Sequence, residues 1–283
     1  MELMRYILAL ENLDSGSRGR RIIAALREMG IEAKVQAWRL PRIRNVIADF
    51  SSELNVKRLL FCAHYDAVAG SKAANDNASG VAVLLGLCER LRHTRAPVQI
   101  VFFDREEAWF RTPLLRLGLL GSTYYVLRRR LRNLHAVYNL EFVGLGNSLG
   151  VWPVKGGEVN LSAVKAVAAA SARLGIPFRI VHIPWLLLSS DHLPFRLRGF
   201  PNSISLSLLP AEAIPALERV LADLSVMRLM KGQRPALPEP LSFIHGTEDS
   251  LSRLSEDSLE LMLSLLVELI RDYAQSVNLP VVL

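Results

Sequence analysis

Three short apolar runs, each ending just before a possible metal ligand, constrain the fold of this chain most. The runs and the residues that follow them are 56–63 with His64, 97–103 with Asp104, and 135–140 with Glu141. Helical patterns separate the runs, and near-continuous apolar strands of this kind are typical of parallel sheets that are buried on both faces. We therefore expect an α/β fold whose mostly parallel central sheet is covered by helices on both faces.

The remaining patterns extend the same alternation along the chain. Helical periodicity is found at residues 18–29, 78–91, 121–132, 159–174, 210–230 and 255–277, and further strands are expected at 32–38, 45–50, 178–183 and 203–208. There is no internal repeat, low-complexity segment or convincing linker, and the proline-containing stretch 230–240 reads as a loop that leads to His245. We expect one domain over residues 1–283.

Charge and composition exclude several classes of protein. The net charge of +7 could attract nucleic acid. However, the arginines at 128–130 lie beside leucines in a helical pattern, which predicts a solvated helix face and no nucleic-acid partner. Cys62 and Cys88 form no CxxC pair. No window reaches the ~18 apolar residues of a membrane span, and no signal peptide is recognisable. We expect a cytoplasmic location and no membrane partner.

Five short segments supply the residue types of a two-metal hydrolase. They are His64-Tyr65-Asp66, Asn75-Asp76-Asn77-Ala78-Ser79-Gly80, Asp104-Arg105-Glu106-Glu107, Asn139-Leu140-Glu141 and Ile244-His245. Several follow strands of the expected parallel sheet, where the functional crevice of such folds lies. Two catalytic metal ions ~3.5–4 Å apart need one bridging carboxylate, two further ligands on each ion and a free carboxylate for proton transfer.

The candidate residues fill these roles completely. The assignment is Asp76 as the bridge, His64 with Glu141 on one ion, and Glu107 with His245 on the other. Glu106 would be the general base, which takes a proton from water and passes it to the leaving amine. Asp66 is two residues from His64 and is expected to accept the second N–H of that ring, which would fix its tautomer.

These segments resemble the co-catalytic zinc exopeptidase family that includes bacterial leucyl aminopeptidases and glutamate carboxypeptidase II. The family pattern is HxD, NDNASG, DxEE followed by GS, an acidic residue after a strand, and a late His. This chain matches with the five segments above, with Gly121-Ser122, and with Glu248-Asp249-Ser250 after His245. The resemblance runs from about residue 15 to the C-terminus. It implies a three-layer catalytic metallopeptidase domain, two divalent ions of which zinc is the first choice, and a peptide substrate with a free N-terminus.

Three departures keep other readings open. Glu141 stands where the family usually has Asp, residues 108–117 are an insertion after Glu107, and Ile244 precedes the late His. Glutaminyl cyclases, more distant relatives, carry a similar insertion, and resemblance to them would imply one zinc and cyclisation of N-terminal glutamine. A third reading is a peptide-binding relative whose catalytic site has decayed at Glu141. Aminopeptidase activity is the function that we predict.

Other polar residues have weaker patterns. Ser190-Asp191-His192-Leu193-Pro194-Phe195 resembles the family's SDHxPF segment, so Asp191 and His192 are candidates for substrate binding, with a capped turn as the alternative. Trp109 in the insertion is a further candidate for a substrate pocket, and packing is its alternative. No GxSxG elbow accompanies the Ser190 segment, so no serine hydrolase is expected. Side-chain specificity, native metal and oligomeric state stay open.

Overall fold

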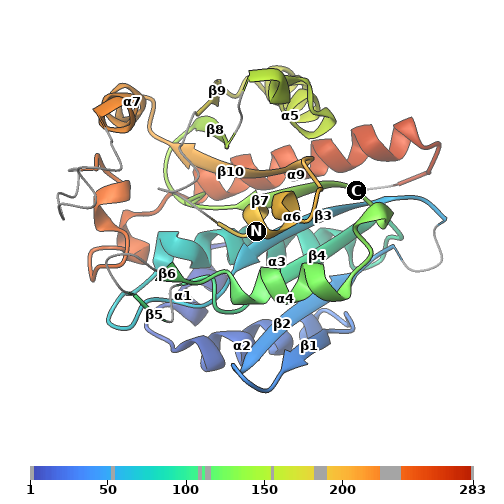
Figure 1. Ribbon diagram of the computed structural model, residues 1–283, viewed down its shortest axis with the longest axis horizontal. Helices are drawn as coiled ribbons and strands as arrows, with labels where there is room; N and C mark the ends of the chain where they lie inside the picture. Colours follow the sequence, from blue (N-terminus) through green and yellow to red (C-terminus); the bar gives the residue numbers. More distant parts are fainter. Residues whose placement is uncertain are drawn as a thin grey trace.

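The structure is a computed structural model that describes residues 3–51, 55–107, 110–111, 116–153, 156–181, 190–223 and 237–281. Its central feature is an eight-stranded sheet in the order β1-β2-β4-β3-β7-β10-β8-β9 (Figure 1). The strands are β1 Lys34–Trp38, β2 Ile43–Asp49, β3 Arg58–His64, β4 Val98–Phe103, β7 Leu134–Leu140, β8 Ser148–Trp152, β9 Phe178–Ile180 and β10 Ser203–Leu209. A separate two-stranded ribbon joins β5 Phe110–Arg111 to β6 Arg116–Leu117.

The middle of the sheet is parallel, as predicted. β4, β3, β7 and β10 run in the same direction, so their carboxyl ends meet at one edge. β1 and β2 add to one side in antiparallel pairings, and β8 pairs antiparallel with β10 before β9 completes the other side. Because β2 runs against β4, the amino end of β2 lies at the same edge as the carboxyl end of β4.

The helices are α1 Met4–Leu10, α2 Ser15–Glu28, α3 Ser79–Leu91, α4 Leu120–Arg128, α5 Ser162–Leu174, α6 His192–Leu197, α7 Ala213–Asp223 and α9 Glu256–Ser276. Shorter helical turns are found at Ala74–Ala78, Leu131–Asn133, Gly156–Asn160, Leu241–Phe243 and Leu251–Arg253. In the part of the chain that the structure describes, no helix has both the length and the apolar character needed to cross a membrane.

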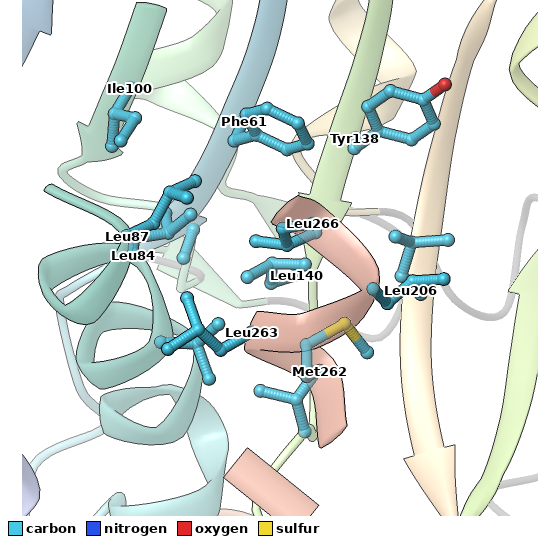
Figure 2. Close-up of a cluster of buried hydrophobic side chains, with 14 of the residues drawn as sticks. Phe61, Leu84, Leu87, Ile100, Tyr138, Leu140, Leu206, Met262, Leu263 and Leu266 are labelled. Atoms are coloured by element: carbon cyan, nitrogen blue, oxygen red, sulfur yellow. The ribbon is translucent and has the colours of Figure 1, made fainter. Parts of the chain in front are cut away.

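The strands send alternate apolar side chains to the two faces of the sheet. On one face, Phe61, Ile100 and Tyr138 pack against α3 and α9 (Figure 2). On the other face, Leu60 and Val101 belong to a smaller cluster that α4 and α6 cover with Tyr125, Val126 and Phe195. Each fully buried side chain of this size contributes roughly 1.5–3 kcal/mol of transfer free energy. The predicted covering of both faces is therefore confirmed.

Some elements differ from the sequence-based expectation. α1 and β8 were not predicted, because α1 is two turns long and β8 mixes Ser and Gly with apolar residues. The helix expected at 121–132 ends at Arg128, after which the chain is extended. The end of the helix expected at 210–230, the last two residues of the strand expected at 178–183, and most of the 108–117 insertion lie outside the described residues.

Candidate metal centre

The carboxyl ends of β3, β4 and β7 bring polar side chains to one edge of the sheet. β3 ends at His64, β4 ends one residue before Asp104, and β7 ends one residue before Glu141. The turn after β4 carries Glu106 and Glu107, and all five side chains are buried. The crevice expected from the parallel topology is therefore lined by His and carboxylate groups.

Two groups of possible metal ligands share Asp76. In the first, Nε2 of His64 lies 3.1 Å from Oδ1 of Asp76 and 3.5 Å from Oε2 of Glu141. In the second, Nε2 of His245 lies 3.3 Å from Oδ2 of Asp76 and 2.9 Å from Oε1 of Glu107. Asp76 thus turns one oxygen to each histidine. The structure brings together all five residues that the sequence suggested as ligands.

This donor set fits zinc. Zinc takes imidazole nitrogen and carboxylate oxygen at about 2.0–2.2 Å, so two such atoms on one tetrahedral ion lie about 3.3 Å apart. The four nitrogen–oxygen separations of 2.9–3.5 Å agree with that spacing. His64 and Glu141 could hold one ion and Glu107 and His245 another, with Asp76 between them. Glu106 belongs to neither pair but lies beside His64 and Glu107.

The turn that carries Asp76 is fixed by hydrogen bonds from distant segments. The carboxylate of Asp249 accepts the backbone N–H groups of Asn75 at 2.6 Å and of Asp76 at 3.0 Å. The side chain of Asn75 in turn accepts the N–H of Gly144 at 2.8 Å, and Asn77 donates to the carbonyl of Leu140 at 2.7 Å. These contacts connect the Asp76 turn to the end of β7, and Glu141 is the residue that follows β7.

Asp66 holds the Glu106–Glu107 turn and also lies beside the ring of His64. Its two oxygens accept the backbone N–H groups of Glu106 and Glu107, each at 3.0 Å. Its distance to Nδ1 of His64 is 3.5 Å, which is long for a hydrogen bond, and that ring nitrogen has no hydrogen-bond partner among the described residues. The expectation that Asp66 accepts the second N–H of His64 stays a prediction, with the two groups within ion-pair distance.

Glu141 is held by its own neighbours. Oε1 accepts a hydrogen bond from Asn139 at 3.1 Å and a short one from the hydroxyl of Ser190. The second oxygen, Oε2, faces His64. The longer side chain at this position is therefore fixed on Oε1 by two protein donors, while Oε2, which accepts a longer hydrogen bond from Asn77 at 3.4 Å, faces the candidate metal site.

The pKa values of the central groups are strongly shifted. Burial lowers the pKa of His64, but the charge of Glu141 and contacts with neighbouring carboxylates outweigh it and raise the pKa well above its ordinary value. For His245 burial is likewise outweighed, and Asp76 and Glu107 raise its pKa to about 9. Burial raises the pKa of Glu106 well above its ordinary value. Cations that bind here must compete with tightly held protons.

Asp191 and His192 have different surroundings. Asp191 is buried near the centre; burial raises its pKa to about 7, and the nearby charge of Glu141 contributes in the same direction. Its side chain accepts no hydrogen bond from a backbone N–H of α6, so Asp191 does not cap this helix with its side chain, and the capped-turn alternative is not observed. His192 is turned to Ser205, whose hydroxyl is 2.8 Å from Nδ1, and to the ring of Trp152. Their suggested substrate-binding roles stay predictions, and Trp109 lies outside the described residues.

Strained backbone conformations gather around the candidate ligands. Ala73, Arg105, Phe142 and His245 have φ angles of 49°, 58°, 54° and 65°. This left-handed region is uncommon for residues other than glycine, and each instance costs of order 1–3 kcal/mol. All four positions are a ligand candidate or lie within three residues of one. The sequence did not indicate these left-handed conformations, because none of the four residues is Gly or Asn.

Sequence reasoning also missed the residues that position the ligands. Asp249, Asn139 and Ser190 had been noted as parts of matching segments, but no role had been given to them. Their partners are distant in sequence, 174 residues away in the case of Asp249 and Asn75. Polar residues next to a ligand motif are the only signal that could have suggested them.

Comparison with a characterised protein and with solved structures agrees with this picture. Aminopeptidase YwaD of Bacillus subtilis (strain 168) is 33% identical over 119 residues, which are 39% of this chain and 24% of that protein. The structure of BSAP, a zinc aminopeptidase from Bacillus subtilis, has a TM-score of 0.59 at 23% identity and covers 81% of this chain. The chain spans about a quarter of the first protein and 50% of the second.

Glutaminyl cyclases share the fold over a larger part of their length. The Porphyromonas gingivalis enzyme has a TM-score of 0.70 at 19% identity, over 96% of this chain and 97% of its own. At such identities the likeness concerns the fold alone. The sequence model of peptidase family M28, in contrast, matches residues 45–270 and so includes every candidate metal ligand. On this match, the chain belongs to peptidase family M28.

Proposed function

We propose that this protein is a zinc-dependent aminopeptidase that removes the N-terminal residue of peptides. The observation that carries the proposal is the carboxylate of Asp76, whose two oxygens face His64 and His245 at 3.1 and 3.3 Å. Each histidine has a second carboxylate beside it, so the chain offers ligands for two cations. When bound, the two ions supply Lewis acidity, which makes water more acidic and polarises a carbonyl group.

Glu106 is the residue to which we assign proton transfer. It is buried beside His64 and Glu107 but is not needed as a ligand in either group around Asp76. Asp66 accepts its backbone N–H at 3.0 Å, which fixes the main chain of the turn that carries it. A pKa raised by burial suits a group that first accepts the proton of the attacking water and then gives it to the leaving amine.

The substitution Glu106→Gln tests the assigned base. The amide has nearly the same shape but cannot accept a proton, so we expect kcat to fall about 10²–10⁴-fold while zinc content and thermal stability are retained. Glu28→Gln, on the exposed surface of α2, is the matched control and should keep full activity. Near wild-type turnover by the Glu106 variant would show that the base has been wrongly assigned.

The glutaminyl-cyclase reading is the second candidate, because the cyclase fold covers almost the whole chain. Mass spectrometry of a peptide that begins with Gln-Leu, after incubation with zinc-loaded protein, separates the two. Loss of the complete first residue supports the aminopeptidase, and loss of ammonia alone supports the cyclase. If the mass is unchanged and fewer than two metal ions bind at micromolar concentration, the chain is the decayed peptide-binding relative.

One catalytic domain is also part of the proposal. Helices from both ends of the chain, α1 and α9, pack into the same core, which supports it. The cytoplasmic location and the absence of a nucleic-acid partner stay predictions.

A further inference from the structure

A cavity of about 280 Å³ opens at the same edge of the sheet as the metal centre. It lies between the first turns of α2 and the amino end of β2, which pairs beside the carboxyl end of β4. Four arginines line it: Arg20 on α2, Arg42 and Arg44 at the start of β2, and Arg105 in the turn after β4. None of these four belongs to the candidate metal ligands.

The charges around this cavity do not cancel. Two carboxylates, Asp14 and Asp104, also line it and offset part of this charge, Asp14 near Arg20 and Asp104 near Arg105. Asp14 accepts hydrogen bonds from the backbone and hydroxyl of Ser17, and Asp104 accepts the backbone N–H of Arg44 at 2.9 Å. Among the described residues, none of the four arginines forms an ion pair with a carboxylate. The cavity therefore has four guanidinium groups against two carboxylates.

Guanidinium groups select for a particular ligand chemistry. Their planar forks donate two parallel hydrogen bonds to a carboxylate or a phosphate, and such charge-assisted bonds are among the strongest that proteins make. The amino end of α2, whose residues Ser15 and Gly16 also line the cavity, adds partial positive charge. A cavity with these charged groups suits an anion and is unfavourable for a cation.

Two residues that line the cavity are neighbours in the chain of residues at the metal centre. Tyr65 lies between His64 and Asp66 in the chain, and its hydroxyl donates to the carbonyl of Arg44 at 2.8 Å. Arg105 directly precedes Glu106, and its Nε donates to the carbonyl of Arg42 at 2.7 Å. A group bound to the arginines would therefore rest against the segments that carry the catalytic residues.

We propose that this cavity binds an anionic oxygen group, a carboxylate or a chemically similar oxyanion. Its source is either an acidic residue of the peptide substrate, downstream of the scissile bond, or a free anion. An extended peptide advances ~3.3–3.6 Å per residue, so the second to fourth residues of a substrate sample the surroundings of the metal centre. The first source rests on the proposed aminopeptidase function, and the second does not.

The first experiment needs no turnover. The thermal midpoint of zinc-loaded protein is measured against sodium sulfate at constant ionic strength, and we expect a saturable rise in the wild type. In the double variant Arg20→Gln/Arg44→Gln, the apparent sulfate affinity should fall about tenfold or more. Arg27→Gln removes the same charge from an exposed position of α2 outside the cavity and should respond as the wild type does.

The proposal is overturned if sulfate does not raise the wild-type midpoint, or if the double variant responds with wild-type affinity. If the thermal midpoint of the double variant without sulfate is far below that of the wild type, the single variant Arg42→Gln is used in its place. The hydrogen bond from Arg105 goes to the backbone carbonyl of Arg42, so changing the Arg42 side chain leaves this contact in place.

The second experiment identifies the source of the anion. The kcat/KM values of Leu-Ala-Ala-Ala amide and of its forms with Asp at the second, third or fourth position are compared. If the substrate supplies the anion, the acidic-to-neutral ratio falls about tenfold in the double variant, through KM, and is unchanged in Arg27→Gln. If the double variant loses the sulfate response but keeps the wild-type ratio of kcat/KM between acidic and neutral peptides, the cavity binds a free anion. No hydrolysis of any peptide, with the sulfate response intact, contradicts the aminopeptidase proposal alone.

Discussion

At the scale of single residues, Glu141 is the position where this chain departs from the pattern that it otherwise follows. Shortening it to the usual residue should not improve the site. In Glu141→Asp the carboxylate is withdrawn by one methylene from His64, and the donors Asn139 and Ser190 lose their acceptor. Because such supporting contacts affect metal affinity about 10–100-fold, we expect zinc binding to weaken by at least about tenfold.

Competition with a fluorescent chelator measures this affinity, and Glu28→Asp on the surface of α2 serves as the control. Equal or tighter zinc binding by Glu141→Asp would mean that the hydrogen bonds to Asn139 and Ser190 do not tune the site. It would also mean that the longer side chain is a neutral replacement.

At the scale of elements, α2 supports the metal centre although it precedes the region matched by the family model. Its Arg18 is completely buried and donates to the carbonyls of Lys72 and Ala73, at 2.9 and 3.2 Å, just before the turn that carries Asp76. Arg18→Met should leave these carbonyls unpaired and remove a positive charge near Asp76. We expect a loss of roughly 2–4 kcal/mol in the free energy of unfolding, together with weaker zinc binding.

Urea unfolding of zinc-loaded protein tests the first part, and zinc titration tests the second. Arg27→Met, an exposed change on the same helix, should alter neither quantity by more than about 0.5 kcal/mol. If Arg18→Met unfolds like the control, then α2 is only a cover for the sheet and does not support the Asp76 turn.

The elements that could be predicted from the sequence are those with a strong local pattern. β3, β4 and β7 were found within two residues, because buried parallel strands are continuous apolar runs. β8 was missed, because its Ser and Gly residues are buried only through pairing with β10 and β9. Tertiary context decides such strands, and a local pattern cannot reveal it.

The candidate site divides in the same way. His64 could be predicted because it ends a strand and Glu141 because it directly follows one, and Asp76, Glu107 and His245 because their motifs combine ligand types. The contacts that fix them could not be predicted, since they join segments far apart in the sequence. Asp66 illustrates the limit: its position suggested a contact with the ring of His64, but not the hydrogen bonds that it accepts from the turn of Glu106.

At the scale of the whole molecule, a chain with a net charge of +7 encloses a buried cluster of carboxylates and histidines. Several of these groups hold protons more tightly than they would in the unfolded chain. The pKa of His245 is raised to about 9 from 6.5, and burial raises the pKa values of Asp104 and Asp249 to about 6 from 3.8. At these groups the folded protein therefore binds more protons than the unfolded chain, first between pH 4 and 6 and then between pH 6.5 and 9, whereas His192 and Asp76, whose pKa values are lowered, act in the opposite direction.

This excess of bound protons predicts opposite effects of pH on stability and on zinc affinity. For protein stripped of metal by a chelator, the contribution of His245 is complete below pH 6.5 and is lost as the pH rises through 9. After allowance for its partial exposure, we expect a loss of about 2 kcal/mol in the free energy of unfolding over that range. Zinc needs the neutral imidazole, so its affinity should rise over the same range as protons leave. Urea unfolding and zinc titrations at pH 6.5 and 9 measure both, and His245→Gln should remove the part of the pH dependence that His245 contributes, while the part from His64, whose pKa is also raised, remains. Stability that increases with pH in the stripped wild type would mean that His245 is not protonated between Asp76 and Glu107.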